Sequence, residues 1–359
     1  MAKKFSYKIE KRQNVGFLVD LLSIAVALLV SIAIASGIIS NSGADVKTVL
    51  WAIVKGSFGS ATAIADTLNR STPILFTGLA TVIAYRAKVW NIGQEGQLYA
   101  GAMAMTFVIL AFPNNQLPVV IYVPLLLVVA IIGGVIWGSI PGILKARFNV
   151  NEIIVTVMLN YVIMYFCTFL LNGVWQEPGS YYYNTIPFPL NSNSPLLFGT
   201  KLHLGFPLAL LLAFSVYLLL WKTRLGYEIR AIGLNPVAST YKGINTKWVM
   251  LIVMLISGGI SGLAGGIELQ GIHHRLIFGF SSSFGFTGIL IALLGRLHPL
   301  GVILAAVFFG ALRNGSTAMR IYSNVSGEIV TLIMGLVIIM LLFCEALFKY
   351  RIRRVENVD

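Results

Sequence analysis

The sequence predicts an all-α polytopic membrane protein with about ten transmembrane helices. Of its 359 residues, 57% are hydrophobic and only 11% are charged, whereas roughly a quarter of the residues of a soluble protein are charged. The apolar residues also come in long blocks, and a block of about 20 residues spans a hydrocarbon core as a helix. Because a bilayer offers the backbone no hydrogen-bond partners, repeated blocks of this length indicate a helical bundle.

Ten apolar segments are expected to span the membrane. The eighth and ninth are short for full spans, and we expect them to be tilted, broken or partly re-entrant. Between the first two spans, the stretch from Asp45 to Arg70 is expected to form an interfacial helix on the outer face. In order, the predicted spans are 17–39, 71–88, 95–112, 119–143, 152–172, 204–221, 248–270, 285–295, 299–314 and 327–347.

The positive charges predict the orientation of the chain. Cytoplasmic loops of membrane proteins carry an excess of Lys and Arg. With the N-terminus inside and the sides alternating, most of the 26 Lys and Arg residues fall inside, so both termini are expected in the cytoplasm. The net charge of +13 is thereby explained by orientation, and no nucleic-acid partner is expected. The first apolar run is too long for a cleaved signal peptide and is expected to remain as a helix.

The chain is expected to form one transmembrane domain, residues 1–359, with its polar parts on defined sides. The external loop carries Trp175 and Tyr181–Tyr183, which suit either a docking surface for another protein or an aromatic belt at the membrane interface. The polar parts are a cytoplasmic N-terminal tail (1–15), the external loop (173–203), a cytoplasmic loop (222–247) and a cytoplasmic C-terminal tail (348–359).

Rows of small residues predict close helix packing. Gly134, Gly138 and Gly142 recur every four residues, as do Gly258, Gly262 and Gly266. Such rows let helix backbones approach closely in lipid. Residues 77–86 also resemble residues 287–296 in sequence, because both segments begin with Thr-Gly and end with Arg. Either an internal duplication or coincidence accounts for this short match.

The cytoplasmic loop contains the signals of a short capped helix. Gly233 marks a break in the preceding structure, and Asn235 is a good N-cap. Pro236 then stands where a first helical residue tolerates the loss of its N–H. The helix is expected to end near Tyr241 and to be closed by Gly243. It suits either a contact with a motor subunit or an ordinary loop.

A second group of polar residues, Asn91 to Gln97, is expected at the cytoplasmic end of a span. Gly93 and Gly96 permit a tight turn, and Glu95 is placed at the N-terminus of the next helix, where the dipole favours its charge. Arg86 or Lys88 could pair with it. We favour a structural or gating hinge over direct contact with a solute, because the predicted position is far from mid-membrane.

Polar residues inside the spans are candidates for a translocation path. These candidates are Asn160, Tyr161, Glu268 and Gln270. Buried polar groups either line such a path or form hydrogen bonds between helices, and both interpretations stay open. The loop from His273 to Phe286 is a candidate outer gate.

Several kinds of chemistry have no support in the sequence. Cys167 and Cys344 lie in apolar runs, and the histidines lack zinc-type spacing. No GxxxxGK[ST] motif is present, so the chain is not expected to bind ATP, another cofactor or a metal, or to act as an enzyme. An ion-coupled transporter would need carboxylates at mid-depth. The acidic residues Asp20, Glu152, Glu328 and Glu345 fall at span ends instead.

Two motifs resemble the branched-chain amino acid, ribose and nucleoside family of ATP-binding-cassette (ABC) importer permeases. The first comprises Gly233, Asn235, Ala238, Gly243 and Ile244. The second motif, which is more specific, lies within Thr72–Ala102 and is similar to the nucleoside and simple-sugar branch of the family. The core of this motif is Asn91, Ile92, Gly93, Glu95, Gly96 and Gln97. The resemblance covers essentially the whole chain, from Gly16 to Phe343.

The resemblance implies a permease of the prokaryotic cytoplasmic membrane that carries nucleosides, or alternatively ribose or another simple sugar. It also implies separate ABC ATPase subunits that hold ATP and Mg, an external substrate-binding protein and a second, shorter permease. An ion-coupled transporter and a membrane enzyme remain the weaker alternatives. Residues 91–97 would act as a gating hinge. Coupling to the ATPase would fall to Arg230, Gly233, Asn235, Pro236, Ala238 and Gly243.

Overall fold

The computed structural model describes residues 5–11, 17–41, 45–113, 116–197, 199–323 and 327–356. The remaining parts of the predicted tails (1–4, 12–15 and 357–359) and residue 198 of the external loop lie outside the described residues. The chain forms two compact units, Ser57–Asn314 and Met1–Gly56 with Gly315–Asp359, and each is described by itself.

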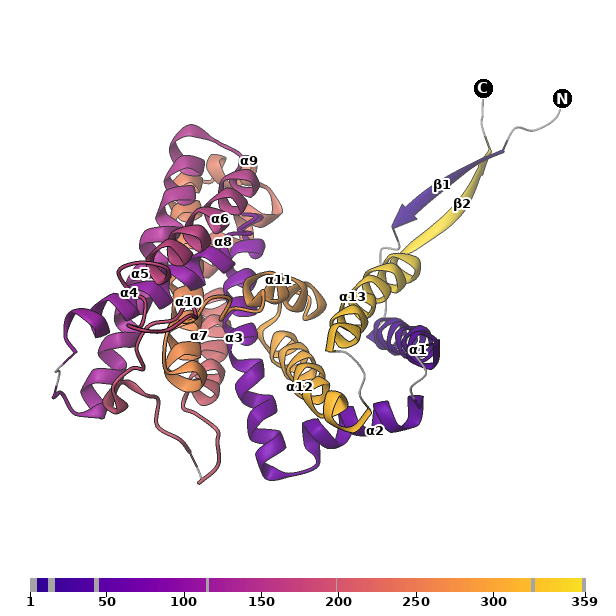
Figure 1. Ribbon diagram of the computed structural model, residues 1–359. Coiled ribbons are helices and arrows are strands. Elements are labelled where there is room, and N and C mark those ends of the chain that lie inside the picture. The colour runs from indigo at the N-terminus through magenta and orange to yellow at the C-terminus, as the bar shows by residue number, and fades with distance from the viewer. Residues whose placement is uncertain are drawn as a thin grey trace. The chain divides into compact units, whose positions relative to one another are not determined.

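The larger unit is a helical bundle in which α10 takes the central place (Figure 1). It packs against α3, α4 and α5. The elements are α3 (Ala61–Arg86), α4 (Gln94–Ala111), α5 (Val119–Phe148), α6 (Glu152–Leu171), the 3₁₀ turn η1 (Leu190–Ser192), α7 (Gly205–Lys222), α8 (Arg224–Leu234), α9 (Pro236–Tyr241), α10 (Thr246–Glu268), the π-helical η2 (Leu269–His273), α11 (Phe284–Leu294) and the first part of α12 (Pro299–Ser323).

The smaller unit joins the two ends of the chain. Helix α1 (Phe17–Asn41) packs against α13 (Gly327–Lys349), and α2 (Val46–Phe58) follows α1. Strands β1 (Phe5–Lys11) and β2 (Tyr350–Glu356) pair antiparallel, with Phe5 opposite Glu356 and Lys11 opposite Tyr350. These two strands were not expected, because pairing between the two ends of a chain leaves no local signal in the sequence.

The helical, multi-pass character of the protein is confirmed. Among the described residues, five single helices are long and apolar enough to cross a membrane: Val119–Phe148, Glu152–Leu171, Gly205–Lys222, Thr246–His273 and Pro299–Tyr322. A pair of helices, 25–41 and 46–58, is bent by 119° at its junction and would count as a sixth span if the pair crosses as one unit.

Two predicted boundaries differ from the structure, at the start of α3 and the end of α12, whereas the eighth predicted span has the short length that was expected. The expected interfacial helix divides at Ser60, whose hydroxyl accepts a hydrogen bond from the Ala63 N–H and caps α3, so α3 begins ten residues before its predicted span. Helix α11 has 11 residues and is about 16 Å long, roughly half the thickness of a hydrocarbon core. Helix α12 continues past the predicted end at residue 314, because the polar Asn314 is held by Ala63 O and Thr67 Oγ1 inside the bundle.

The predicted glycine rows form the crossing of α5 and α10. A Cβ at Gly134 would collide with the carbonyl oxygen of Gly258, and one at Gly262 with that of Ala130. Gly101 of α4 meets Gly262 as closely. Three backbones thus approach at one point, as small residues allow in membrane helices.

Candidate functional site

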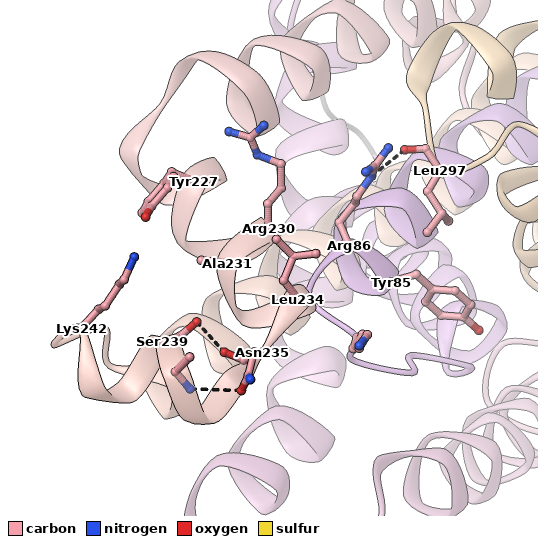
Figure 2. A pocket seen from close by; sticks show the side chains of 13 residues that line it. Tyr85, Arg86, Tyr227, Arg230, Ala231, Leu234, Asn235, Ser239, Lys242 and Leu297 are labelled. Atoms are coloured by element: carbon pink, nitrogen blue, oxygen red, sulfur yellow. Dashed lines mark hydrogen bonds between the residues drawn. The ribbon is translucent and has the colours of Figure 1, made fainter. Parts of the chain in front are cut away.

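The loop that was predicted to be cytoplasmic (222–247) folds into two helices, of which the second has the predicted caps. Asn235 Oδ1 accepts a hydrogen bond from the Ala238 N–H at 3.1 Å, Pro236 is the first helical residue, and Gly243 has φ +81°. Figure 2 shows the Ser239 side chain folded back onto Asn235 (Oγ to O 2.8 Å). The preceding helix α8 was not predicted, although Thr223 caps it in the same way through the Gly226 N–H.

A cavity of about 630 Å³ is lined by this helix pair and by the end of α3 (Figure 2). On its wall, Arg86 donates from Nε to Leu297 O at 3.0 Å, and Arg230 donates from Nε to Gly226 O at 3.3 Å. A Cβ at Gly233 would collide with the carbonyl oxygen of Arg86. The predicted break at Gly233 is wrong, because Gly233 lies inside α8, which ends at Leu234. The glycine instead allows α8 to rest directly on the end of α3.

The outer side of the helix pair is unusually apolar for a polar loop. Leu234, Val237 and Tyr241 are 83%, 64% and 89% exposed. A contiguous exposed apolar surface of this kind is typical of a site of protein contact.

The segment between α3 and α4 turns back into the bundle. Glu95 accepts hydrogen bonds from Ser281 Oγ at 2.6 Å and from the Gly285 N–H at 2.7 Å. Thr77 donates to the carbonyl oxygen of Phe284, the residue before Gly285, at 2.9 Å. Thr77 lies about 13 Å of helix rise before Arg86, the last residue of α3. Helix α4 therefore begins deep inside the bundle, level with the middle of α3.

This placement corrects the expected surroundings of Glu95. The sequence suggested a position at the cytoplasmic end of a span and a pairing with Arg86 or Lys88. Glu95 lies in the first turn of α4, as predicted. Its side chain reaches the N-terminus of α11, where the free N–H of Gly285 and the helix dipole both favour a carboxylate, and Arg86 is bonded to Leu297.

Amide side chains hold the turned-back segment, which we call the inner loop (residues 87–97). Asn91 Nδ2 donates to Ser257 Oγ of α10 at 2.9 Å and to Gln97 Oε1 at 3.1 Å, and Asn91 Oδ1 accepts from the Gly93 N–H at 2.9 Å. Gln94 hydrogen bonds to the hydroxyl of Thr81. All these side chains are buried. Buried polar groups need hydrogen-bond partners inside a membrane protein. Here these side chains form hydrogen bonds with one another, with Ser257 and with the backbone of the loop.

Asn160 of α6 ties the same loop from the other side. It accepts from the Gly96 N–H at 2.8 Å and donates to Ile92 O at 2.9 Å. Gly96 must be small here, because a Cβ would lie 2.8 Å from Asn160 Oδ1. Two groups that the sequence analysis kept apart, the hinge residues and Asn160, thus form one cluster.

The other path candidates lie elsewhere. Tyr161 is 52% exposed on the outer side of α6. Glu268 and Gln270 are buried at the far end of α10, and Glu268 lies about 16 Å of helix rise beyond Ser257. Gln270 donates to Val123 O at 3.5 Å, which is an interhelical hydrogen bond.

Sequence reasoning missed Thr77, Thr81, Ser281 and Gly285 as members of the cluster. For Thr77 and Thr81, one signal was the similarity of residues 77–86 to residues 287–296. The two segments pack side by side on α3 and α11, with Gly78 and Gly288 in contact.

Comparison with known proteins agrees with this architecture. The family described as "Branched-chain amino acid transport system / permease component" matches residues 63–342. The guanosine ABC transporter permease protein NupP of Bacillus subtilis is 36% identical over 88% of this chain and 90% of its own length.

The names of two further relatives mention different substrates. The glucose ABC transporter permease protein TsgB13 of Haloferax volcanii is 33% identical, over 80% of this chain and 78% of its own length. The nucleoside ABC transporter permease protein NupB of Lactococcus lactis is 32% identical over 79% of both chains. No solved structure matches. The chain belongs to the branched-chain amino acid transport system permease family and is a multi-pass transport component.

Proposed function

We propose that this chain is the permease subunit of an ABC importer that carries nucleosides across the cytoplasmic membrane of a prokaryote. The observation that carries the proposal is the 36% identity to a guanosine permease over nearly the full length of both chains. NupB, named as a nucleoside permease, supports the same substrate class. The name of TsgB13 supports the second candidate, ribose or another simple sugar.

The proposed topology has ten spans with both termini in the cytoplasm. The distribution of Lys and Arg supports it. The two short terminal strands pair with each other, which agrees with two termini on the same side of the membrane.

Helix α9 is proposed to dock into a separate ATPase subunit, which would hold ATP and Mg. This chain would bind no cofactor of its own. The support is the exposure of Val237 and Tyr241 on α9, whose caps keep it in shape, and of Leu234 at the end of α8. Gly233 and Arg86 would pass movement of this helix to α3, because their backbones are in contact. The inner loop is proposed as the hinge that changes its conformation when α3 moves.

A second permease and an external binding protein complete the proposed complex. Bacillus subtilis has two guanosine permease proteins, NupP and NupQ, and Lactococcus lactis has two nucleoside permease proteins, NupB and NupC. This chain is 36% and 32% identical to the first of each pair but 28% and 27% identical to the second. We therefore propose a heterodimer. The exposed Tyr181 and Tyr182 of the external loop suit contact with the binding protein.

Uptake tests the substrate. Cells that lack the chain are compared with restored cells for uptake of labelled guanosine, uridine and ribose. Loss and rescue of nucleoside uptake is the expected result. Loss of ribose uptake alone would move the substrate to sugars, and unchanged uptake of all three, in cells without a redundant importer, would refute the assignment.

Co-purification tests the coupling helix. Tyr241→Ser, on α9, is expected to reduce the ATPase recovered with the tagged permease by about ten-fold. Tyr181→Ser is the matched control, because Tyr181 is 99% exposed but lies in the external loop. Equal recovery with both variants would show that α9 is not the docking helix.

A further inference from the structure

A second cavity lies at the opposite end of α10 from the coupling helix. Its volume is about 540 Å³, within the range of roughly 300–1,000 Å³ that small-molecule sites occupy. The start of α3, the π-helical η2, the loop before α11 and Arg313 of α12 line it. All of these segments belong to the larger unit. Neither the coupling loop nor the inner loop contributes to it.

Glu268 supplies an incomplete hydrogen-bonding group in the wall of this cavity. The residue is 3% exposed, and its Oε1 lies 3.3 Å from His273 Nε2. Its Oε2 is buried and has no hydrogen-bond partner among the described residues. Burial of a carboxylate oxygen without a donor is costly. The helix also widens to a π-helix directly after Glu268, an irregularity that is frequent at functional sites.

The charges of the lining favour a neutral solute. Asp66 and Glu268 supply two negative charges, whereas Arg70, Lys201 and Arg313 supply three positive ones. With neutral histidines this gives a slight positive excess, which does not attract a cation. An ionised carboxylate only accepts hydrogen bonds, so a donor such as a hydroxyl can complete Glu268 without adding a charge.

Two aromatic side chains also contribute to the lining. Phe280 and Phe284 are both buried against the cavity. The Arg313 guanidinium lies 4.7 Å from the centre of the Phe284 ring. Aromatic rings and guanidinium planes both stack on nucleobases and on the apolar faces of sugars.

We propose that this cavity is an outer reception site for a neutral, hydroxyl-bearing solute, in which Glu268 Oε2 accepts a ribose or sugar hydroxyl. The proposal rests on the proposed function and adds the place where this chain itself recognises the solute. The donor that Glu268 lacks in this conformation is then supplied by the transported molecule. The aromatic wall takes the face of the base or of the sugar.

Protection of a single thiol tests whether the solute enters the cavity. Cys167 and Cys344 are both buried, so Ser282→Cys places one reactive thiol in the cavity wall. In the purified full complex, guanosine is expected to slow maleimide labelling of this thiol at least five-fold. Tyr165→Cys, on the exposed side of α6, is the control and is expected to label at an unchanged rate. Unchanged labelling of both thiols with guanosine and with ribose would overturn the proposal.

Deoxy-nucleosides test the role of Glu268. Uptake of guanosine, 2′-deoxyguanosine and 3′-deoxyguanosine is compared in the unmodified chain and in Glu268→Gln. If the carboxylate accepts a ribose hydroxyl, the variant lowers guanosine uptake about ten-fold, but uptake of the matching deoxy-nucleoside less than three-fold. The binding protein acts equally in both chains, so its own preference cancels in this comparison. Glu177→Gln, an outer acid paired with Arg275 outside the cavity, is the control.

The outcomes separate the two proposals. An equal fall for all three nucleosides assigns Glu268 a structural role and overturns the reception site, while the nucleoside importer stands. No nucleoside uptake by the unmodified chain refutes the proposed function. In that case, protection of the Ser282→Cys thiol by ribose alone would support the reception site with a sugar as its solute.

Discussion

Asn160 offers a quantitative test of the inner loop. Asn160→Leu keeps the size and shape of the side chain but removes its hydrogen-bonding groups. The Gly96 N–H and the Ile92 carbonyl oxygen, which lie 2.8 and 2.9 Å from the Asn160 side chain, would then lose their partner. Because both backbone groups are inside the bundle, water does not readily replace it.

The expected loss can be worked from these two contacts. Hydrogen bonds between membrane helices average about 0.6 kcal/mol each, which sets a lower bound of about 1.2 kcal/mol. A buried backbone group left without a partner costs about 1–3 kcal/mol, which sets an upper bound of about 6 kcal/mol for the two. We expect a loss of about 2–4 kcal/mol, or a fall in Tm of roughly 5–10 °C.

The assay is the thermal stability of the purified complex in detergent, followed by the fraction that remains monodisperse after heating. Asn172→Leu is the matched control, because Asn172 ends the same helix, is exposed and makes no side-chain hydrogen bond in the part of the chain that the structure describes. If both variants lower Tm equally, Asn160 does not hold the inner loop.

Three further predictions concern other parts of the larger unit. Gly262→Val is expected to abolish assembly of the permease, because its Cβ has no room at the crossing of α5 and α10; Gly335→Val, where nothing lies within 4 Å, is expected to leave the yield of purified complex unchanged. Gly233→Ala is expected to lower uptake at least ten-fold with normal recovery of permease, because the Cβ would push α8 off the Arg86 carbonyl; normal uptake would remove the contact from the coupling route. Burial, and to a lesser extent His274, lowers the pKa of His203 to about 4 from 6.5, so the fold favours the neutral imidazole. Stability is therefore fully present above pH 6.5 and falls by on the order of 3 kcal/mol as the pH drops towards 4; His203→Gln is expected to remove this part of the pH dependence of Tm, and an unchanged profile would refute it.

Local chemistry was predictable from the sequence because it acts over a few residues. Asn235 caps α9 through an N–H three positions away, and Gly243 ends the turn with φ +81°, so the neighbouring residues contain all the required information. The long apolar blocks likewise predicted membrane helices, and the glycine rows predicted a close crossing, because period and composition are properties of one segment. The partner of each row was not predictable in the same way.

Contacts between distant segments were decided only by the tertiary structure. Glu95 and Ser281 are 186 residues apart, and nothing near Glu95 indicates that it caps another helix. The nearest basic residues suggested an ion pair, but the inner loop carries Glu95 away from them and into the bundle. The polar Asn314 predicted the end of a span, but in the structure its side chain donates hydrogen bonds to Ala63 O and Thr67 Oγ1 within the bundle.

The sequence by itself determined the class of the protein, its membrane-spanning character, its glycine-lined packing and the capped helix α9, because each depends on composition, period or chemistry within a few turns. Only the tertiary structure decided the depth of the inner loop, the union of Asn91 and Asn160 in one cluster, and the cavity around Glu268. These features arise where helices from separate parts of the chain meet, and the energy of a buried polar group depends on which partners that meeting supplies.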